Sequence, residues 1–143
     1  MPKIERSITV NAPVDKVCAY MSEPKNQLEW LPGMTGISDI VRTEQEVGSH
    51  FRWTYKMMGI PFHGESKTVE YVPNKRAVVK NTGIPSTWTW GYEPQGGGTK
   101  ISLTVEYTIP VPVLGKVAER LVLRQNEREA DLGLANIKER LES

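Results

Sequence analysis

The chain has 143 residues, enough for one domain with a single hydrophobic core. Its 18 Lys and Arg nearly balance its 17 Asp and Glu, which leaves a formal net charge of +1. No run of basic residues is dense enough to follow a phosphate backbone. We therefore expect one domain over residues 1–143 and no nucleic-acid partner.

Targeting and metal signals are missing from the sequence. The N-terminus becomes charged within five residues and has no apolar segment of the signal-peptide kind, and no apolar run approaches the roughly 20 residues of a membrane span. We expect a cytoplasmic protein with no integral membrane segment. The single cysteine, Cys18, has no partner for a disulfide, and His50 and His63 are not spaced as metal ligands. We expect no metal and no cofactor.

The first 33 residues predict one strand and two short helices. Apolar residues alternate over Ile4–Val10, which is typical of a half-buried strand. Asn11–Pro13 is a helix start, and Pro24 ends the helix that follows. Lys25–Leu31 predicts a second helical turn, which Pro32–Gly33 breaks.

The middle of the chain predicts a series of strands. Alternation with period two is clearest in Ser49–Met57 and Lys100–Ile109, where apolar and polar side chains strictly oppose one another. The full set of expected strands in this part is Ile37–Arg42, Ser49–Met57, Phe62–Val72, Ala77–Thr82, Ser86–Tyr92 and Lys100–Ile109.

After Pro112 the pattern is helical for about 28 residues, far longer than a usual helix. Its apolar positions change phase along the chain. Leu114, Val117, Ala118, Leu121 and Val122 share one face, and a nearly opposite face holds Leu123, Ala130, Leu134, Ile137 and Leu141. Either the helix kinks near Gln125–Asn126, or its first half is apolar toward something other than the sheet core.

The turns between the strands are of two chemical kinds. Polar turns (43–48, 73–76 and 94–99) alternate with apolar ones (57–61, 83–85 and 109–114). In an up-and-down antiparallel sheet, successive turns fall at opposite ends, so the apolar turns should share one end of the molecule. Clustered apolar loops often mark a ligand entrance, a partner surface or a membrane contact.

The order of elements predicts an α+β fold in which a curved antiparallel sheet of seven strands wraps around the long C-terminal helix. A sheet of this kind does not close tightly along a whole helix, so we expect a cavity between them. Its aromatic inner face is also compatible with ordinary core packing. The candidate ligand-binding residues are Phe51, Trp53, Tyr55, Trp88, Trp90, Tyr92, Leu103, Val105, Tyr107, Val117 and Leu121.

The apolar turns should form the mouth of this cavity, together with the segment that leads into the second strand. The expected mouth residues are Trp30, Met58, Ile60, Ile84 and Leu114. The same apolar rim also fits a homodimer contact or a transient membrane contact.

An enzyme would need an acid or base inside the cavity. The candidates are Tyr55, His63 and Glu65. With a tight turn at Gly59–Ile60, Tyr55 pairs with Gly64, and His63 and Glu65 point outward; a shift of one residue would turn them inward.

Five segments resemble the START-like, helix-grip superfamily that includes the birch pollen allergen, and in particular its polyketide cyclase/dehydrase-like branch. These segments are Asn11–Val17, Trp30–Gly33, Val69–Arg76, Gly97–Lys100 and Leu134–Lys138. The resemblance implies two short helices after the first strand, a curved seven-stranded sheet around a long C-terminal helix, and a hydrophobic cavity for lipids, sterols, polyketides or aromatic molecules. It carries over no catalytic motif.

Three functions remain open from the sequence. The first is a noncatalytic carrier or sensor of a small hydrophobic ligand. The second is a cyclase or dehydratase acting on a polyketide-like substrate, and the third is a module that docks its apolar rim on a protein or a membrane.

Overall fold

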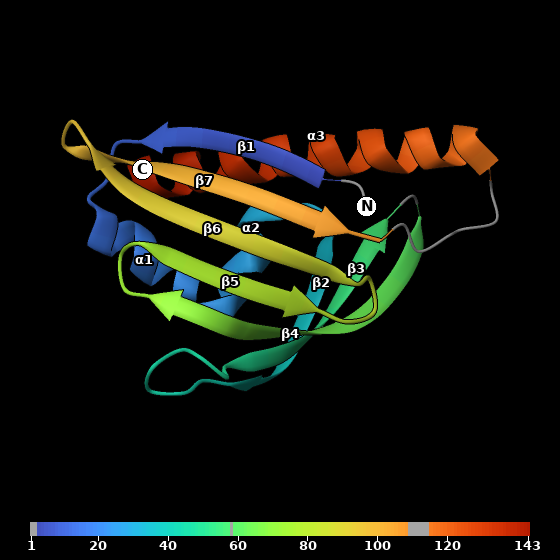
Figure 1. Ribbon diagram of the computed structural model, residues 1–143, viewed down its shortest axis with the longest axis horizontal. Helices are drawn as coiled ribbons and strands as arrows, with labels where there is room; N and C mark the ends of the chain where they lie inside the picture. The colour runs from blue at the N-terminus through green and yellow to red at the C-terminus, as the bar shows by residue number, and fades with distance from the viewer. Residues whose placement is uncertain (1–2, 58, 109–114) are drawn as a thin grey trace.

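The computed structural model describes residues 3–57, 59–108 and 115–143, and the side chains of these residues except 115–119. A curved antiparallel sheet of seven strands packs on three helices (Figure 1). The elements are β1 (Lys3–Val10), α1 (Val14–Ser22), a 3₁₀ turn (Pro24–Asn26), α2 (Gln27–Trp30), β2 (Met34–Val41), β3 (His50–Met57), β4 (Ile60–Val72), β5 (Arg76–Asn81), β6 (Ser86–Gln95), β7 (Gly98–Tyr107) and α3 (Gly115–Glu142).

The strand order is β1-β7-β6-β5-β4-β3-β2, and each pair is antiparallel. This is the predicted meander with β1 added beside β7. The β6–β7 connection is the shortest turn: Gln95 pairs with Gly98, and Gly96 and Gly97 have φ of 56° and 88°. A hairpin of two residues needs such positive φ values, which glycine adopts without strain.

The two short helices begin and end where the prolines predict. Pro13 caps α1, Asp15 lies in its first turn, and Pro24 starts the 3₁₀ turn that leads into α2. The backbone N–H of Lys56 donates to the Gly33 carbonyl at 2.8 Å, which ties the segment after α2 to the end of β3. In this way α2 and the Pro32–Gly33 break are fixed beside the cavity.

The long helix α3 is continuous from Gly115 to Glu142, so the first of the two alternatives for its change of apolar face, a break near Gln125–Asn126, does not occur. Val122 is buried at 2% exposure, whereas its neighbour Leu121 is 48% exposed. The two residues therefore lie on different faces of α3, because successive residues of a helix are about 100° apart. The sequence predicted one shared face for them, and that prediction is wrong. The buried face continues through Ala130, Leu134, Ile137 and Leu141.

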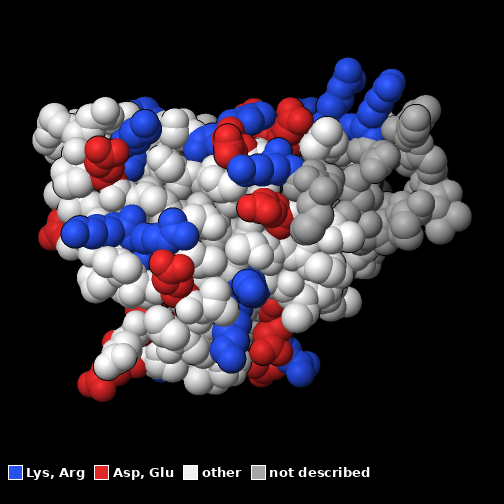
Figure 2. All heavy atoms as spheres, viewed as in Figure 1, with Lys and Arg blue, Asp and Glu red and all other residues white. Residues whose placement is uncertain are grey.

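The expected gathering of apolar turns holds for the described segments. The antiparallel order places the β3–β4 and β5–β6 turns, the end of β7 and the start of β2 at one end of the sheet. Met58 and residues 109–114 lie outside the described residues. On the face in Figure 2, Lys and Arg are mixed with Asp and Glu, and neither sign forms a patch. No described helix has both the length and the hydropathy of a bilayer span.

Candidate functional site: an aromatic cavity with a buried carboxylate

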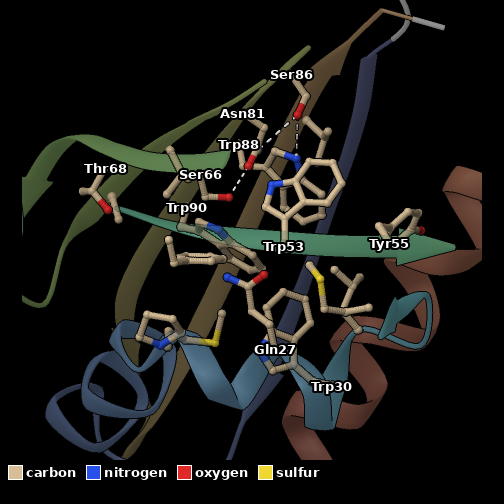
Figure 3. A pocket seen from close by; sticks show the side chains of 18 of the residues that line it. Gln27, Trp30, Trp53, Tyr55, Ser66, Thr68, Asn81, Ser86, Trp88 and Trp90 are labelled. Carbon is tan, nitrogen blue, oxygen red and sulfur yellow. Dashed lines mark hydrogen bonds between the residues drawn. The ribbon is translucent and has the colours of Figure 1, made fainter. Parts of the chain in front are cut away.

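A cavity of about 170 Å³ lies between the concave face of the sheet and the helices (Figure 3). Its walls are mainly apolar and come from α2, the inner faces of β3, β4, β5 and β6, the end of β7, and α3. The aromatic residues of the wall are Trp30, Phe51, Trp53, Tyr55, Tyr71, Trp88, Trp90, Tyr92 and Tyr107.

Strict alternation along the strands explains why the large rings meet there. Side chains two residues apart on β3 and on β6 share the concave face. Trp30 meets Trp90 edge to face at 5.6 Å between ring centroids, and Trp53 meets Tyr55 at 6.5 Å. These contacts hold rings from three elements around one space.

The predicted ligand-binding residues fall into three groups. Those that line the cavity are Phe51, Trp53, Tyr55, Trp88, Trp90, Tyr92, Val105 and Tyr107. Leu103 and Leu121 lie outside its wall: Leu103 is part of the filled core, and Leu121 faces solvent from α3. The side chain of Val117 lies outside the described ones.

Two of the five residues predicted for the cavity mouth lie in the cavity wall. Trp30 and Ile84 line the cavity. Ile60 is 51% exposed and lies outside the wall, because it is at the tip of the β3–β4 hairpin. Met58 and Leu114 are not among the described residues.

The strand register decides where the expected acid–base candidates point. Tyr55 pairs with Phe62 and Trp53 with Gly64, two residues away from the predicted register. An even offset keeps each side chain on its predicted face. Tyr55 therefore lines the cavity, whereas His63 is exposed with its Nδ1 3.1 Å from Thr54 Oγ1. Glu65 pairs with Arg52 and does not line the cavity, so the inward arrangement does not occur.

A carboxylate that the sequence analysis did not single out lines the cavity instead. Glu129 of α3 is 7% exposed, and its Oε1 accepts a hydrogen bond from the Gly33 N–H. A Cβ added at Gly33 would lie 2.6 Å from Tyr55 Cε2 and 2.9 Å from Glu129 Oε1, so the two side chains meet over this glycine. Burial, reinforced by the nearby Glu129 carboxylate, raises the pKa of Tyr55 well above its ordinary value.

The signal for Glu129 is its position on the helix. Val122, Asn126, Glu129, Gly133 and Ile137 follow one another at spacings of three and four residues, so all lie on the buried face. Two polar residues, Asn126 and Glu129, interrupt this face, and both line the cavity. A polar residue at a core position of a helix is the pattern that could have identified the site.

Further polar groups are embedded in the aromatic walls. A chain of hydrogen bonds runs from Ser66 to Asn81, from Asn81 Nδ2 to Ser86 Oγ at 3.1 Å, and from Trp88 Nε1 to the same Ser86 Oγ at 3.2 Å (Figure 3). Trp53 Nε1 and the Tyr107 hydroxyl are buried and have no hydrogen-bond partner among the described residues. Both groups belong to side chains of the cavity wall.

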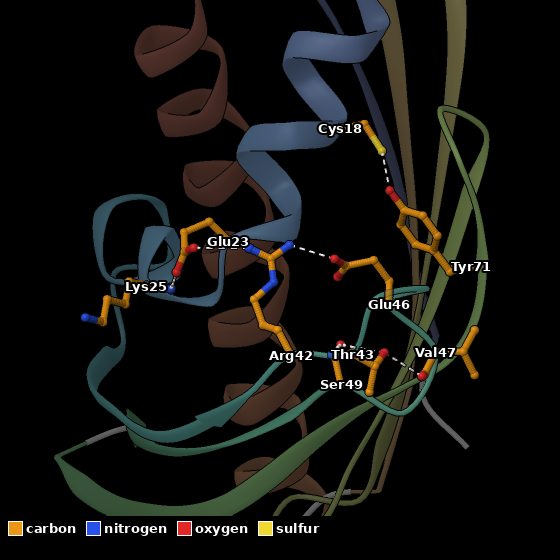
Figure 4. A network of polar contacts seen from close by, with 9 residues as sticks. All are labelled: Cys18, Glu23, Lys25, Arg42, Thr43, Glu46, Val47, Ser49 and Tyr71. Carbon is orange, nitrogen blue, oxygen red and sulfur yellow. Dashed lines mark hydrogen bonds and ion pairs between the residues drawn. The ribbon is translucent and has the colours of Figure 1, made fainter.

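The end of the cavity opposite the apolar turns is polar (Figure 4). Arg42 lies between two carboxylates, with Nη2 2.6 Å from Glu46 and Nη1 3.3 Å from Glu23. Nearby, Cys18 Sγ is 3.2 Å from the Tyr71 hydroxyl. Arg42, Glu46 and Tyr71 all line the cavity, so this ion-pair network forms its polar end.

The curved sheet that encloses a cavity against a long terminal helix defines a helix-grip, START-like protein. The family model described as "Polyketide cyclase / dehydrase and lipid transport" matches residues 1–142. The chain belongs to this family. No curated protein is detectably similar to it in sequence.

Solved structures with the same fold have low sequence identity to this chain. TTHA0849 from Thermus thermophilus is 20% identical with a TM-score of 0.83, over 98% of this chain and 97% of that one. The Zhui aromatase/cyclase from Streptomyces sp. R1128 is 16% identical with a TM-score of 0.82, over 98% and 93%. A START superfamily protein from Mycobacterium smegmatis is 13% identical with a TM-score of 0.81, over 97% and 96%. At these identities, the likeness establishes the fold alone.

Proposed function

We propose that the protein binds one small hydrophobic, ring-containing molecule in this cavity and acts as a carrier or sensor. The observation that carries the proposal is a wall of aromatic side chains in which Trp53 Nε1, a donor, is buried without a partner among the described residues. Leaving such a group unpaired costs about 1–3 kcal/mol, which a ligand oxygen would offset.

The volume of the cavity limits the size of the ligand. A cavity of about 170 Å³ is similar to the roughly 150 Å³ apolar cavity that holds benzene in another protein. A molecule of one or two rings fits this space, and a long-chain lipid needs the walls to move apart. A ligand oxygen would accept a hydrogen bond from Trp53 Nε1.

Binding of naphthol, a two-ring molecule with one oxygen, tests the proposal through quenching of the tryptophan fluorescence. Ala77 lines the cavity on β5, and Ala77→Trp should fill the space and abolish binding. The matched control is Ala135→Trp on the exposed face of α3, which should bind as the unchanged protein does. If Ala77→Trp does not fold, as judged by circular dichroism, Val79→Trp in the same wall replaces it. Binding that both cavity-filling variants retain would overturn the proposal.

A second candidate, acid–base catalysis of the cyclase or dehydratase kind, is favoured by one observation: the Glu129 carboxylate lies beside Tyr55 in the cavity. A buried carboxylate next to a phenol is an arrangement able to move protons within a bound molecule. It predicts turnover of a small polyketide-like ketone that Glu129→Gln and Tyr55→Phe both abolish. Turnover that survives both changes would exclude this site.

A further inference from the structure

The charges of the cavity wall do not balance. Among the described residues, the charged side chains that line it are Arg42, Glu46 and Glu129. Arg42 is already paired with Glu46 and with Glu23, which lies next to the cavity lining. No described cationic side chain lies within ion-pair distance of Glu129. Within the described part of the chain, the cavity therefore contains one carboxylate without a counter-ion.

Holding the chain together does not explain this charge. Glu129 does tie Gly33 to α3 through its hydrogen bond. The same segment is tied to the same helix by a neutral side chain, because Asn136 Nδ2 donates to the Trp30 carbonyl at 3.1 Å. An amide oxygen at position 129 would serve the Gly33 N–H equally well. A buried carboxylate is more costly than a buried amide, and a positive charge beside it would offset that cost.

One aromatic ring lies beside the carboxylate, and others lie next to that ring or to the next turn of α3. Tyr55 meets it over Gly33, and Trp53 packs edge to face on Tyr55. A Cβ at Gly133, one helical turn after Glu129, would lie 3.3 Å from Trp30 Cε3, so Trp30 covers the neighbouring turn of α3. Trp30 in turn contacts Trp90. Ring faces attract cations, and they do so most strongly where water is excluded.

We propose that Glu129 and the rings around it form a subsite for a positively charged nitrogen, so that the ligand is a protonated aromatic amine of one or two rings. This inference rests on the proposed binding function and specifies the ligand class for the same cavity. The ammonium group supplies the missing counter-ion of Glu129, and the ring of the ligand occupies the space between Trp53, Trp88 and Trp90.

Three probes of similar size and different charge test the proposal: phenethylamine, phenethyl alcohol and phenylacetate, measured by calorimetry at neutral pH. We expect the amine to bind at least about tenfold more tightly than the alcohol, and the carboxylate to bind most weakly. Glu129→Gln keeps an acceptor for Gly33 and removes the charge. It should erase the preference for the amine, so that the amine and the alcohol bind to this variant with affinities within about twofold of each other.

The matched control is Glu127→Gln, which removes the same charge two residues away, where Glu127 pairs with Arg6 at 3.5 Å outside the cavity wall. This variant should keep the preference for the amine. Equal binding of amine and alcohol, or a preference that Glu129→Gln retains, would overturn the cation subsite and leave the proposed binding function standing. Failure of all three probes and of naphthol to bind would overturn the binding function itself.

Discussion

A buried polar atom either has a partner or costs free energy, and Tyr107 illustrates the second case. Its side chain is 3% exposed, and its hydroxyl makes no well-formed hydrogen bond among the described residues, although the Asn126 side chain is close enough to affect its pKa. Tyr107→Phe keeps the ring and removes the unsatisfied group. We expect the free energy of unfolding of the ligand-free protein to stay level or to rise by about 1 kcal/mol, as measured by urea denaturation.

A satisfied hydroxyl provides the contrast. Thr99 is fully buried, and its Oγ1 donates to the Ala12 carbonyl at 2.8 Å. Thr99→Val should lower the free energy of unfolding by about 1–3 kcal/mol, because it leaves that carbonyl without its partner. If Tyr107→Phe proves as destabilising as Thr99→Val, the Tyr107 hydroxyl has a partner in solution.

At the scale of single residues, the sequence predicts which aromatic side chains face the cavity better than it predicts which polar side chains do. Alternation along a strand assigns a face to each side chain, and that rule places Trp53, Tyr55 and Trp90 on the cavity side. Glu129 is a charged residue on a helix, where the ordinary expectation is a solvent-exposed face. Its burial depends on how α3 is rotated against the sheet, and local patterns do not determine that rotation.

At the scale of elements, the chain packs most tightly on β4 at one glycine, Gly64. A Cβ at Gly64 would clash with the Thr82 carbonyl oxygen and with the ring of Trp53, its partner across β3. A backbone oxygen cannot move aside as a flexible side chain can. We expect Gly64→Ala to lower the free energy of unfolding by about 1–3 kcal/mol, as measured by thermal or urea denaturation.

Gly91 on β6 is the matched control for the same substitution in a strand. A Cβ there would lie 3.7 Å from Ser102 Cβ, which is an ordinary contact. Gly91→Ala should leave stability level or raise it slightly, since alanine has less conformational freedom to lose than glycine. Equal losses at both glycines would contradict the close approach at Gly64.

The strands also show why the pairing register is harder to predict than the face on which each side chain lies. The sequence predicted the tight turn at Gly59–Ile60, but Ile60 already begins β4 and pairs with Met57, so Tyr55 pairs with Phe62 and not with Gly64. The period of two along a strand is insensitive to an even offset, so the facing of His63 is correct although its pairing is not. Likewise, the helical spacing predicted the length of α3, but Leu121 and Val122 were placed on one face when only Val122 is buried.

At the scale of the whole molecule, the order of turns was enough to predict the distribution of polarity. The meander places the described apolar turns at one end of the sheet and the Arg42 network at the other. The cavity between these ends, its volume and its uncompensated carboxylate arise from packing of β3, β6, β7, α2 and α3. These contacts join residues up to about a hundred positions apart, so no local pattern contains them.

The five tyrosines make the fold sensitive to alkaline pH. Burial is the leading cause that raises the pKa of each one, Tyr20, Tyr55, Tyr71, Tyr92 and Tyr107, above the ordinary 10.0. A raised pKa in the folded state means that the folded protein keeps protons which the unfolded chain releases above pH 10. The stabilisation is therefore complete below pH 10 and is lost as the pH rises beyond it.

We expect the tyrosines to ionise at a pH above their ordinary pKa, and to do so as the protein unfolds. Tyrosinate absorbance and far-ultraviolet circular dichroism, followed in one alkaline titration, should change over the same pH range. That range should lie above the pH at which half of the tyrosines ionise in the protein unfolded by urea. The native and denatured titrations should coincide only if the phenols are solvated in the fold. Ionisation of all five tyrosines near pH 10 with the circular dichroism intact would contradict the burial that raises their pKa values, including those of Tyr55, Tyr92 and Tyr107 in the cavity wall.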